Sequence, residues 1–437
     1  MTTTTETLPK AERVLLVGIQ SEKAEGPESE SLLRELRGLA KTLGLEVVDQ
    51  IMVKLREKTA NLLVGKGKAD EITTIAKSED VDSIIFDYPL SPVQQRNWET
   101  LSGKKAYDRA ELILKIFSAR AMTKEASLQV ELARLQYALP RLAHSYEDLS
   151  RQRGGRYGTK GSGEQKIELD RRSIEKRIHE IEDELENVKK SRSVQRKKRE
   201  RIEVPRAALV GYTNVGKSSL LNAISRADAL AEDKLFATLD PMTRRLSLSS
   251  GATLLVTDTV GFVRNLPHGL IEAFNATLEE AANADILIHV ADASDPETAI
   301  HMATTDKVLS EIGAALVPRI HVLNKIDIAD SGVVEAWQRA YPDGALVSAA
   351  TGEGIQELVG KIEASLTAGM EDIVLEIPHA DYAVVSLLHR EGSIISEESG
   401  DESTRVHCRI PQRTLGKVAK YRLSGPEKPA PPPLMGD

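Results

Sequence analysis

Apolar and polar positions follow two different periods over the first part of the chain. The run Arg13 to Ile19 (RVLLVGI) is typical of a buried strand, and the stretch from Ser31 to Leu43 repeats its apolar positions at helical spacing. Two more strand-like runs and two more helical patterns follow: Leu62 to Gly65 and Val81 to Phe86, then Ala69 to Lys77 and Pro92 to Leu101. Residues 10–118 are therefore predicted to form an N-terminal α/β domain.

The next segment contains two apolar stripes at heptad spacing: Leu128, Leu132, Leu135, Leu139 and Leu142, then Ile174, Ile178, Ile181, Leu185 and Val188. Between them, the five glycines of Arg151 to Gly163 (RQRGGRYGTKGSG) exclude a continuous helix. Residues 119–203 are predicted to form an antiparallel helical hairpin with a tip loop at about 148–164. We expect Pro140 to kink the first arm.

Strands and helices alternate again over residues 204–370, which predicts a larger domain with a parallel sheet. Short strand-like runs at Asp372 to Ile377 and Arg405 to Ile410 predict a small α/β C-terminal domain at residues 371–423. The start at residues 1–9 and the proline-rich tail at residues 424–437 contain too few apolar residues to pack. Both ends are expected to be disordered.

Composition narrows the class of protein. Of the 437 residues 41% are hydrophobic, which is enough for several buried cores. The single cysteine, Cys408, excludes an intramolecular disulfide and favours a reducing compartment. The start lacks the pattern of a secretory signal, and no stretch approaches the roughly 18 apolar residues that span a bilayer. We expect a cytoplasmic protein without a membrane partner, and a monomer, since one chain can satisfy both heptad stripes.

The charge is unevenly distributed along the chain. The net charge is −8, yet residues 151–206 hold 18 Lys or Arg against 11 Asp or Glu, a local charge of +7. This charge fits a solvated hairpin that only spaces two domains. It equally fits contact with RNA, because the tip loop combines cations with one stacking ring: Arg151, Arg153, Arg156, Lys160, Lys166 and Tyr157. The residues alone leave both interpretations open.

A phosphate-binding pattern follows the strand-like run Ala207 to Val210. The segment GYTNVGKS matches G-x-x-x-x-G-K-[ST] between a strand and a helix. Its backbone N–H groups would converge on phosphate oxygens, Lys217 would neutralise the β and γ phosphates, and Ser218 would ligate Mg²⁺. The predicted phosphate site comprises Gly211, Tyr212, Thr213, Asn214, Val215, Gly216, Lys217, Ser218 and Ser219. The run GKGK at residues 65–68 lacks this spacing and fits either a phosphate contact or a simple turn.

A γ-phosphate sensor is predicted after the strand-like run Leu254 to Thr257, in the sequence Asp258, Thr259, Val260, Gly261. Asp258 would hold Mg²⁺ through water, and the Gly261 N–H would meet the γ-phosphate. A loop with Phe236, Ala237 and Thr238 precedes it, and Thr238 is the favoured residue to turn onto Mg²⁺, with Thr243 as its competitor. The expected catalytic residues are therefore Lys217, Thr238 and Gly261.

A guanine site is indicated by Asn324, Lys325 and Asp327 after the run Ile320 to Leu323. A carboxylate at Asp327 can accept two hydrogen bonds from guanine that adenine cannot supply. Backbone N–H groups after the run Ala345 to Val347 would reach the base carbonyl, at Ser348, Ala349 and Ala350. The set predicts binding and hydrolysis of GTP.

The position after Gly261 holds Phe262, and a phenyl ring cannot align a water. Intrinsic hydrolysis is therefore expected to be slow, with activation from a partner. Asn214 is a candidate to help a monovalent cation, K⁺, bridge the phosphates.

Nearly the whole chain resembles the HflX family of ribosome-associated translational GTPases, which are P-loop GTPases of the TRAFAC class. The resemblance is carried by LSPVQQRN at 90–97, LQVEL at 128–132, LPRL at 139–142, LSRQ at 149–152, the tip-loop glycines, DRR at 170–172, FATLDP at 236–241 and DTVGFV at 258–263. It implies binding to the large ribosomal subunit, with the tip loop on ribosomal RNA near the peptidyl transferase region. It further implies GTP-dependent dissociation of stalled or idle ribosomes and ribosome-stimulated hydrolysis.

Two rival hypotheses remain. A GTP-gated protein-interaction switch would use the heptad hairpin to hold a protein partner without splitting ribosomes. An RNA-remodelling ATPase is disfavoured by Asp327.

Overall fold

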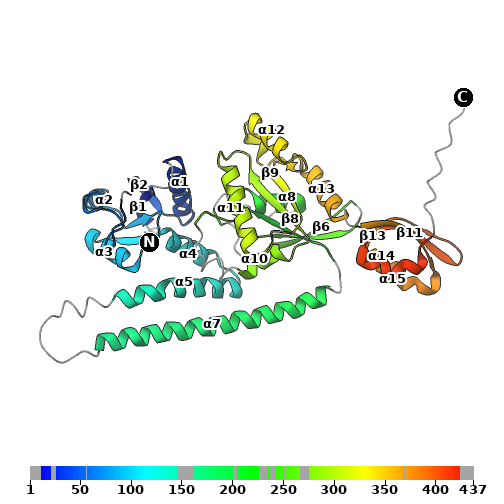
Figure 1. Ribbon diagram of the computed structural model, residues 1–437, viewed down its shortest axis with the longest axis horizontal. Helices are drawn as coiled ribbons and strands as arrows, with labels where there is room; N and C mark the ends of the chain where they lie inside the picture. The colour runs from blue at the N-terminus through cyan, green and yellow to red at the C-terminus, as the bar shows by residue number, and fades with distance from the viewer. Residues whose placement is uncertain are drawn as a thin grey trace, which may run out of the picture.

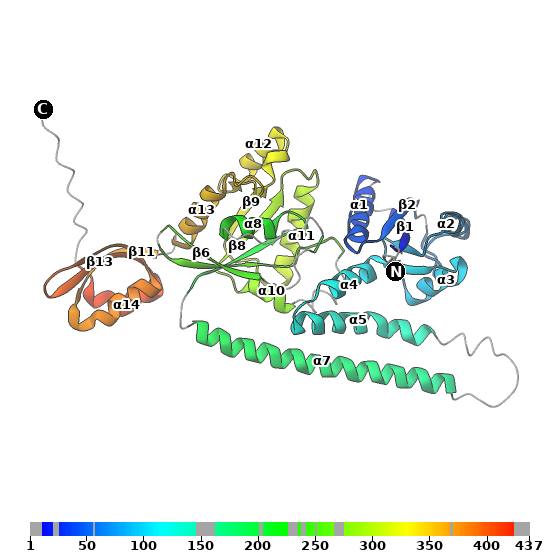
Figure 2. The ribbon, with the colours of Figure 1, turned by 180° about the vertical axis from the view of Figure 1, so that it is seen from behind.

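The computed structural model describes residues 11–20, 26–55, 57–145, 162–200, 204–225, 235–236, 242–249, 251–265, 275–367 and 370–423. Figures 1 and 2 show an N-terminal domain at one end, a central domain, and a C-terminal part at the other end, with a long helical hairpin running along the first two. The fold is mixed α/β, as the hydrophobic pattern predicts.

The N-terminal domain is built on a parallel sheet of order β2-β1-β3-β4. Its strands are β1 (Arg13–Gln20), β2 (Glu46–Lys54), β3 (Ser83–Phe86) and β4 (Lys105–Asp108), and its helices are α1 (Gly26–Thr42), α2 (Lys66–Ser78), α3 (Pro92–Ser102) and α4 (Arg109–Arg120). Alternate residues of β1 point to opposite faces. Leu16 packs with residues of α1 and α4, whereas Leu15 packs with residues of α2 and α3.

One predicted strand of this domain is wrong. The run Leu62 to Gly65 forms a turn with one isolated bridge between Thr59 and Leu63, and Leu63 has a left-handed φ of 68°. Leu63 and Val64 are buried, and Leu62 partly so, without joining the sheet. The strand in this part of the chain is β2, which was not predicted because its pattern is that of a half-exposed strand. The GKGK run is the N-cap and first turn of α2.

The motif LSPVQQRN organises the N-terminal domain. Ser91 caps α3 in a reciprocal capping box with Gln94. Gln95 accepts a hydrogen bond from Arg141 Nε at 2.9 Å, and Arg141 Nη2 donates to the Leu90 carbonyl at 2.9 Å. Arg141 belongs to α5 (Lys124–Ser145), which continues through Pro140. The first hairpin arm is thereby fastened to the N-terminal domain.

The second arm, α7 (Ser162–Glu200), packs along α5. Residues of both heptad stripes form one apolar cluster, with Ile181 fully buried at its centre. Arg177 of α7 pairs with Glu131 of α5 through Nε and Nη2, at 2.8 and 3.0 Å. In the part of the chain that the structure describes, no helix has the length and apolar character needed to cross a membrane.

The central domain holds a six-stranded sheet of order β10-β9-β8-β5-β7-β6, parallel except for β6. Its strands are β5 (Arg206–Gly211), β6 (Met242–Ser247), β7 (Thr253–Asp258), β8 (Ile286–Asp292), β9 (Arg319–Asn324) and β10 (Ala345–Leu346). Its helices are α8 (Lys217–Ser225), α10 (Asn275–Ala282), α11 (Thr298–Glu311), α12 (Ser331–Ala340) and α13 (Ile355–Thr367). Because β5, β7, β8 and β9 are parallel, their carboxyl ends lie at one edge, where ligands of such sheets bind.

The C-terminal part is an antiparallel sheet of order β11-β13-β12 with helices packed against it. It comprises β11 (Met370–Pro378), α14 (Tyr382–Glu391), β12 (Ser393–Ser399), β13 (Ser403–Pro411) and α15 (Gln412–Val418). Cys408 is fully buried in its core. In both views it lies beyond β6 and α13.

Candidate nucleotide site

The loop GYTNVGKS joins the end of β5 to the start of α8, as predicted. Gly211 and Gly216 have φ angles of 149° and 89°. A Cβ on Gly211 would lie 2.3 Å from the Val290 carbonyl oxygen, and a Cβ on Gly216 would lie 2.3 Å from Asn324 Nδ2. Gly211 is therefore required by the close approach of a backbone carbonyl, Gly216 by the close approach of the Asn324 side chain, and both by φ. A glycine-containing loop that leads into the first turn of a helix offers backbone N–H groups to an anion.

Lys217 is buried at the base of this loop. Its Nζ donates to the carbonyls of Tyr212 and Gly211, at 2.7 and 3.1 Å. Burial lowers the pKa of Lys217 to about 8, and Asp258 acts in the opposite direction. A buried ammonium group that donates to backbone carbonyls favours a nearby anion, which a phosphate can supply.

Ser218 and Asp258 bring two hard oxygen ligands together from different elements. The Ser218 hydroxyl at the start of α8 donates to Asp258 Oδ2 at the end of β7, at 2.6 Å. Thr259 fixes the next step of the chain, because its hydroxyl donates to the Leu209 carbonyl at 2.6 Å. A hydroxyl next to a carboxylate fits the ligand chemistry of Mg²⁺.

Of the two competing threonines, the structure describes Thr243 alone. Thr243 lies on β6, and its hydroxyl is 2.9 Å from the Thr257 hydroxyl across the β6 and β7 pair. Thr238 and Ala237 lie outside the described residues, so their role stays a prediction. Phe236 is buried and contacts Phe117 of α4 at a ring distance of 4.5 Å.

The segment after Asp258 lies on the phosphate loop by backbone pairing. Thr213 N–H donates to the Phe262 carbonyl at 2.8 Å, and Phe262 N–H donates to the Gly211 carbonyl at 3.1 Å. A Cβ on Gly261 would lie 2.8 Å from Thr213 Cα and 2.9 Å from Lys217 Nζ. The Phe262 side chain is buried in the core, where it cannot orient a water. No pattern in the sequence indicates this pairing.

The base-recognition residues follow β9 and β10. The Asn324 side chain donates to the Val215 carbonyl and accepts from the Ala349 N–H, so it joins the phosphate loop to the Ser348–Ala350 loop. Lys325 has a left-handed φ of 65° and pairs with Asp292 at 2.6 Å. Asp327 is exposed on a short 3₁₀ turn (Ile326–Ile328), where a base can reach it.

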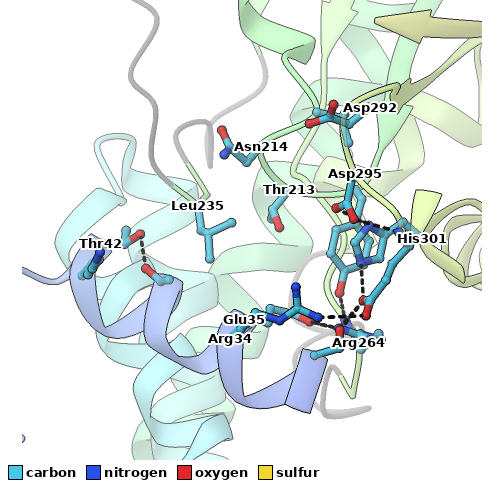
Figure 3. A pocket seen from close by; sticks show the side chains of 16 residues that line it. Arg34, Glu35, Thr42, Thr213, Asn214, Leu235, Arg264, Asp292, Asp295 and His301 are labelled. Atoms are coloured by element: carbon cyan, nitrogen blue, oxygen red, sulfur yellow. Dashed lines mark hydrogen bonds and ion pairs between the residues drawn. The ribbon is translucent and has the colours of Figure 1, made fainter. Parts of the chain in front are cut away.

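Sequence reasoning missed a group of residues beside the phosphate loop. A cavity of about 510 Å³ separates α1 of the N-terminal domain from Thr213 and Asn214 (Figure 3). Its wall on the central domain includes Asp292, Asp295 and His301, which lie on or after β8. The rule that parallel strands carry functional residues at their carboxyl ends could have flagged Asp292.

The candidate RNA contacts are not placed by the structure. Arg151, Arg153, Arg156, Tyr157 and Lys160 lie outside the described residues. Lys166 lies within α7, and its side chain is outside the description. These six residues stay predictions.

The fold and the loop chemistry define a P-loop GTPase. Three family profiles match consecutive parts of the chain: "GTP-binding GTPase N-terminal" at residues 30–118, "GTP-binding GTPase Middle Region" at 120–199 and "50S ribosome-binding GTPase" at 206–325.

Relatives match along nearly the full length. The chain is 43% identical over 422 residues to GTPase HflX of Akkermansia muciniphila, covering 94% of this chain and 97% of the relative. It is 38% identical over 383 residues to GTPase HflX of Escherichia coli, covering 86% and 90%. The chain belongs to the HflX family of GTPases, and it hydrolyses GTP.

A solved structure of a GTP-binding protein from Sulfolobus solfataricus in complex with GDP is also similar. It is 26% identical, with a TM-score of 0.43, and the match covers 82% of this chain and 99% of that one.

Proposed function

We propose that this protein binds the large ribosomal subunit and, in its GTP-bound form, separates stalled or idle ribosomes into subunits. Membership of the HflX family supports a ribosome-associated GTPase, and residues 206–325 match a profile described as a 50S ribosome-binding GTPase. The observation that carries the proposal is the burial of Phe262 at the position where a GTPase can hold a water-orienting side chain. An enzyme built this way needs a catalytic group from a partner.

Within this proposal the nucleotide is held by three sets of residues. Lys217, the loop N–H groups and the Gly261 N–H bind the phosphates. Ser218, Asp258 through water, and Thr238 would hold Mg²⁺, which would neutralise phosphate charge. Asp327 accepts the guanine hydrogen bonds, with Lys325 against the ring and residues 348–350 at the base carbonyl. Asn214 would help to hold K⁺ near the phosphates, where it would supply positive charge, so hydrolysis should be faster in potassium than in sodium.

The chemistry is phosphoryl transfer to water, and this chain contributes positioning and positive charge. Because Phe262 leaves the attacking water without a partner, hydrolysis by the free protein is slow. A group supplied in trans can be worth roughly 10³ to 10⁵ in rate. The ribosome is the proposed source of that group.

The hairpin is the proposed ribosomal RNA arm. Its heptad side chains pack between α5 and α7, and Arg141 ties α5 to the N-terminal domain. Because the apolar stripes are used within the hairpin, they offer little to a partner helix. This disfavours the rival protein-interaction switch. The basic tip, with Arg151, Arg153 and Arg156, is left to contact phosphates.

The test is sedimentation of intact ribosomes with the protein plus GTP, a non-hydrolysable GTP analogue or GDP, while phosphate release is measured in parallel. We expect subunit separation with either triphosphate and not with GDP, and hydrolysis stimulated by ribosomes. Replacing Arg151, Arg153 and Arg156 by Gln should weaken salt-sensitive ribosome association, whereas a matched triple replacement of exposed cations on α7 (Arg171, Arg172 and Lys176) should not.

Ribosomes that sediment unchanged, with hydrolysis at its basal rate, would refute ribosome splitting. Ribosome association that survives the tip replacements would instead favour a protein contact.

A further inference from the structure

The segment from Gly261 to Arg264 connects the phosphate loop to the N-terminal domain. At its start, the Phe262 backbone is hydrogen bonded to Gly211 and Thr213 of the loop. At its end, the Arg264 N–H donates to the Tyr212 hydroxyl at 2.8 Å. Four consecutive residues thus lie along the loop that must receive the nucleotide.

The Arg264 side chain leaves the central domain and enters the N-terminal domain (Figure 3). Both Nε and Nη2 lie 3.1 Å from Glu35 Oε2, and Nη2 donates to the Ser31 hydroxyl at 2.6 Å. Glu35 and Ser31 belong to α1. The Arg264 and Glu35 side chains are only 9% and 8% exposed, so this ion pair is desolvated and sensitive to small displacements.

The pair is part of a larger buried network of alternating charge. Glu35 Oε1 also pairs with Arg109 Nη2 at 2.5 Å, and Arg109 Nη1 pairs with Asp87 Oδ1 at 2.8 Å. On the other side, Arg264 Nη2 pairs with Glu297 of the central domain at 3.2 Å. Two arginines therefore face three carboxylates across the two domains, and Arg34 of α1 adds a further cation 3.6 Å from Glu297.

A γ-phosphate must enter the space beside this segment. Gly261 lies so close to Lys217 that a Cβ would be 2.9 Å from Nζ, and the Thr213 N–H is already bonded to the Phe262 carbonyl. GDP makes no demand on the Gly261 N–H, because it has no third phosphate and needs Lys217 only at its β phosphate. GTP needs Lys217 and the Gly261 N–H on opposite sides of that phosphate, so residues 261–264 must move away from the loop.

We propose that the Glu35 and Arg264 pair is a latch through which the N-terminal domain holds residues 261–264 on the phosphate loop. Seating of the γ-phosphate opens the latch, and the cost of opening lowers the affinity for GTP relative to GDP. By linkage, GTP loosens the contact of α1 with the central domain to the same extent. Glu35 is a positioning residue in this scheme, because it acts on the nucleotide through Arg264. The proposal uses the established GTPase activity and does not depend on ribosome splitting.

The first experiment compares the full-length protein with the variant Glu35→Gln. Glutamine keeps the shape, and the remaining network still balances two arginines with Asp87 and Glu297. The dissociation constants for GDP and for a non-hydrolysable GTP analogue are measured by equilibrium titration. We expect affinity for the analogue to rise between about 5-fold and 100-fold with GDP affinity unchanged. The control is Glu30→Gln, the same change on the exposed face of α1, which should alter neither constant.

The latch would be refuted if Glu35→Gln had the same nucleotide preference as the wild type. It would also be refuted if the dissociation constants for GDP and the GTP analogue changed by the same factor. Arg264→Gln should shift the preference in the same direction, and the double variant should shift it no further, because either change alone breaks the pair.

A second measurement needs no variant. Hydrogen exchange of α1 peptides in the wild-type protein should be faster with the GTP analogue than with GDP, since α1 loses its contact to Arg264. Equal exchange of residues 26–42 in both states would refute the proposal even if the variants failed to fold.

Discussion

Asn324 holds Val215 of the phosphate loop, because its Nδ2 donates to the Val215 carbonyl at 2.8 Å. The same side chain accepts the Ala349 N–H at 3.0 Å. The residue that opens the base-recognition motif therefore fixes two other parts of the site, and it does so from a fully buried position. The phosphate loop and the base loop form one unit through this amide.

The variant Asn324→Asp tests that connection. A carboxylate cannot donate to Val215, and it places a negative charge beside a carbonyl in a buried site. We expect affinities for GDP and GTP to fall together, by about 10-fold or more. Equilibrium titration measures both constants. Asn97→Asp is the control, since Asn97 makes a similar amide contact to the Asn61 carbonyl in the N-terminal domain, far along the chain from the nucleotide loops. A loss for only one nucleotide would contradict this account.

Asp327 should decide which base is bound. Replacing it by Asn removes the double acceptor for guanine and supplies a donor that suits the second carbonyl of xanthine. We expect Asp327→Asn to lose about 100-fold or more in GTP affinity and to gain affinity for xanthosine triphosphate. Competition titration with both nucleotides checks this. Asp343→Asn removes the same charge from another exposed position of the central domain and should leave the preference unchanged. If the Asp327→Asn variant still prefers GTP, residues other than Asp327 recognise the base.

The hairpin depends on the packing of Ile181, which is fully buried among heptad residues of both arms. Ile181→Ala should destabilise the pairing of α5 with α7 by about 2 to 5 kcal/mol, because it leaves a cavity. Hydrogen exchange of α7 peptides should increase accordingly. The control is Leu169→Ala on the same helix, where the side chain is 64% exposed. Unchanged exchange in Ile181→Ala would show that the arms are held by their ion pairs instead.

Chemical motifs predicted the site better than hydrophobic pattern predicted the elements. The loop residues Gly211 to Ser218 appear where the sequence placed them because glycine, lysine and serine at that spacing have few other uses. The apolar residues of the run Leu62 to Gly65 indicate burial and so predict a strand, yet Leu63 is buried in a turn. Apolar runs report burial and leave the backbone conformation undetermined.

Long-range contacts were beyond any local pattern. Glu35 and Arg264 are 229 residues apart in the chain, and neither stands in a recognisable motif position for the other. The strand β2 was missed for a related reason: its polar residues Asp49 and Gln50 interrupt the apolar run, and only pairing with β1 makes it a strand. Such features depend on how separate elements dock.

His289 should make the central domain sensitive to acid. It lies fully buried on β8, and among the described residues neither ring nitrogen has a hydrogen-bond partner. Burial, with smaller contributions from His321, Arg319 and Lys217, lowers the pKa of His289 to about 3. In the unfolded chain the pKa is about 6.5. Between these values the unfolded state binds a proton that the folded state does not, so the free energy of unfolding falls as the pH falls from about 6.5 towards about 3.

The variant His289→Leu removes the buried imidazole and, with it, this contribution to the pH dependence of the free energy of unfolding. From about pH 6.5 to about pH 5 the wild type should lose about 1.5 kcal/mol of stability relative to the variant. Thermal unfolding measures the difference, with the central domain's transition identified by its shift on adding GDP. His179→Leu replaces a histidine that is 80% exposed on α7 and should keep the wild-type pH dependence. If His289→Leu kept the wild-type pH dependence as well, the acid sensitivity would have to come from other groups, because the variant differs from the wild type only in lacking this imidazole.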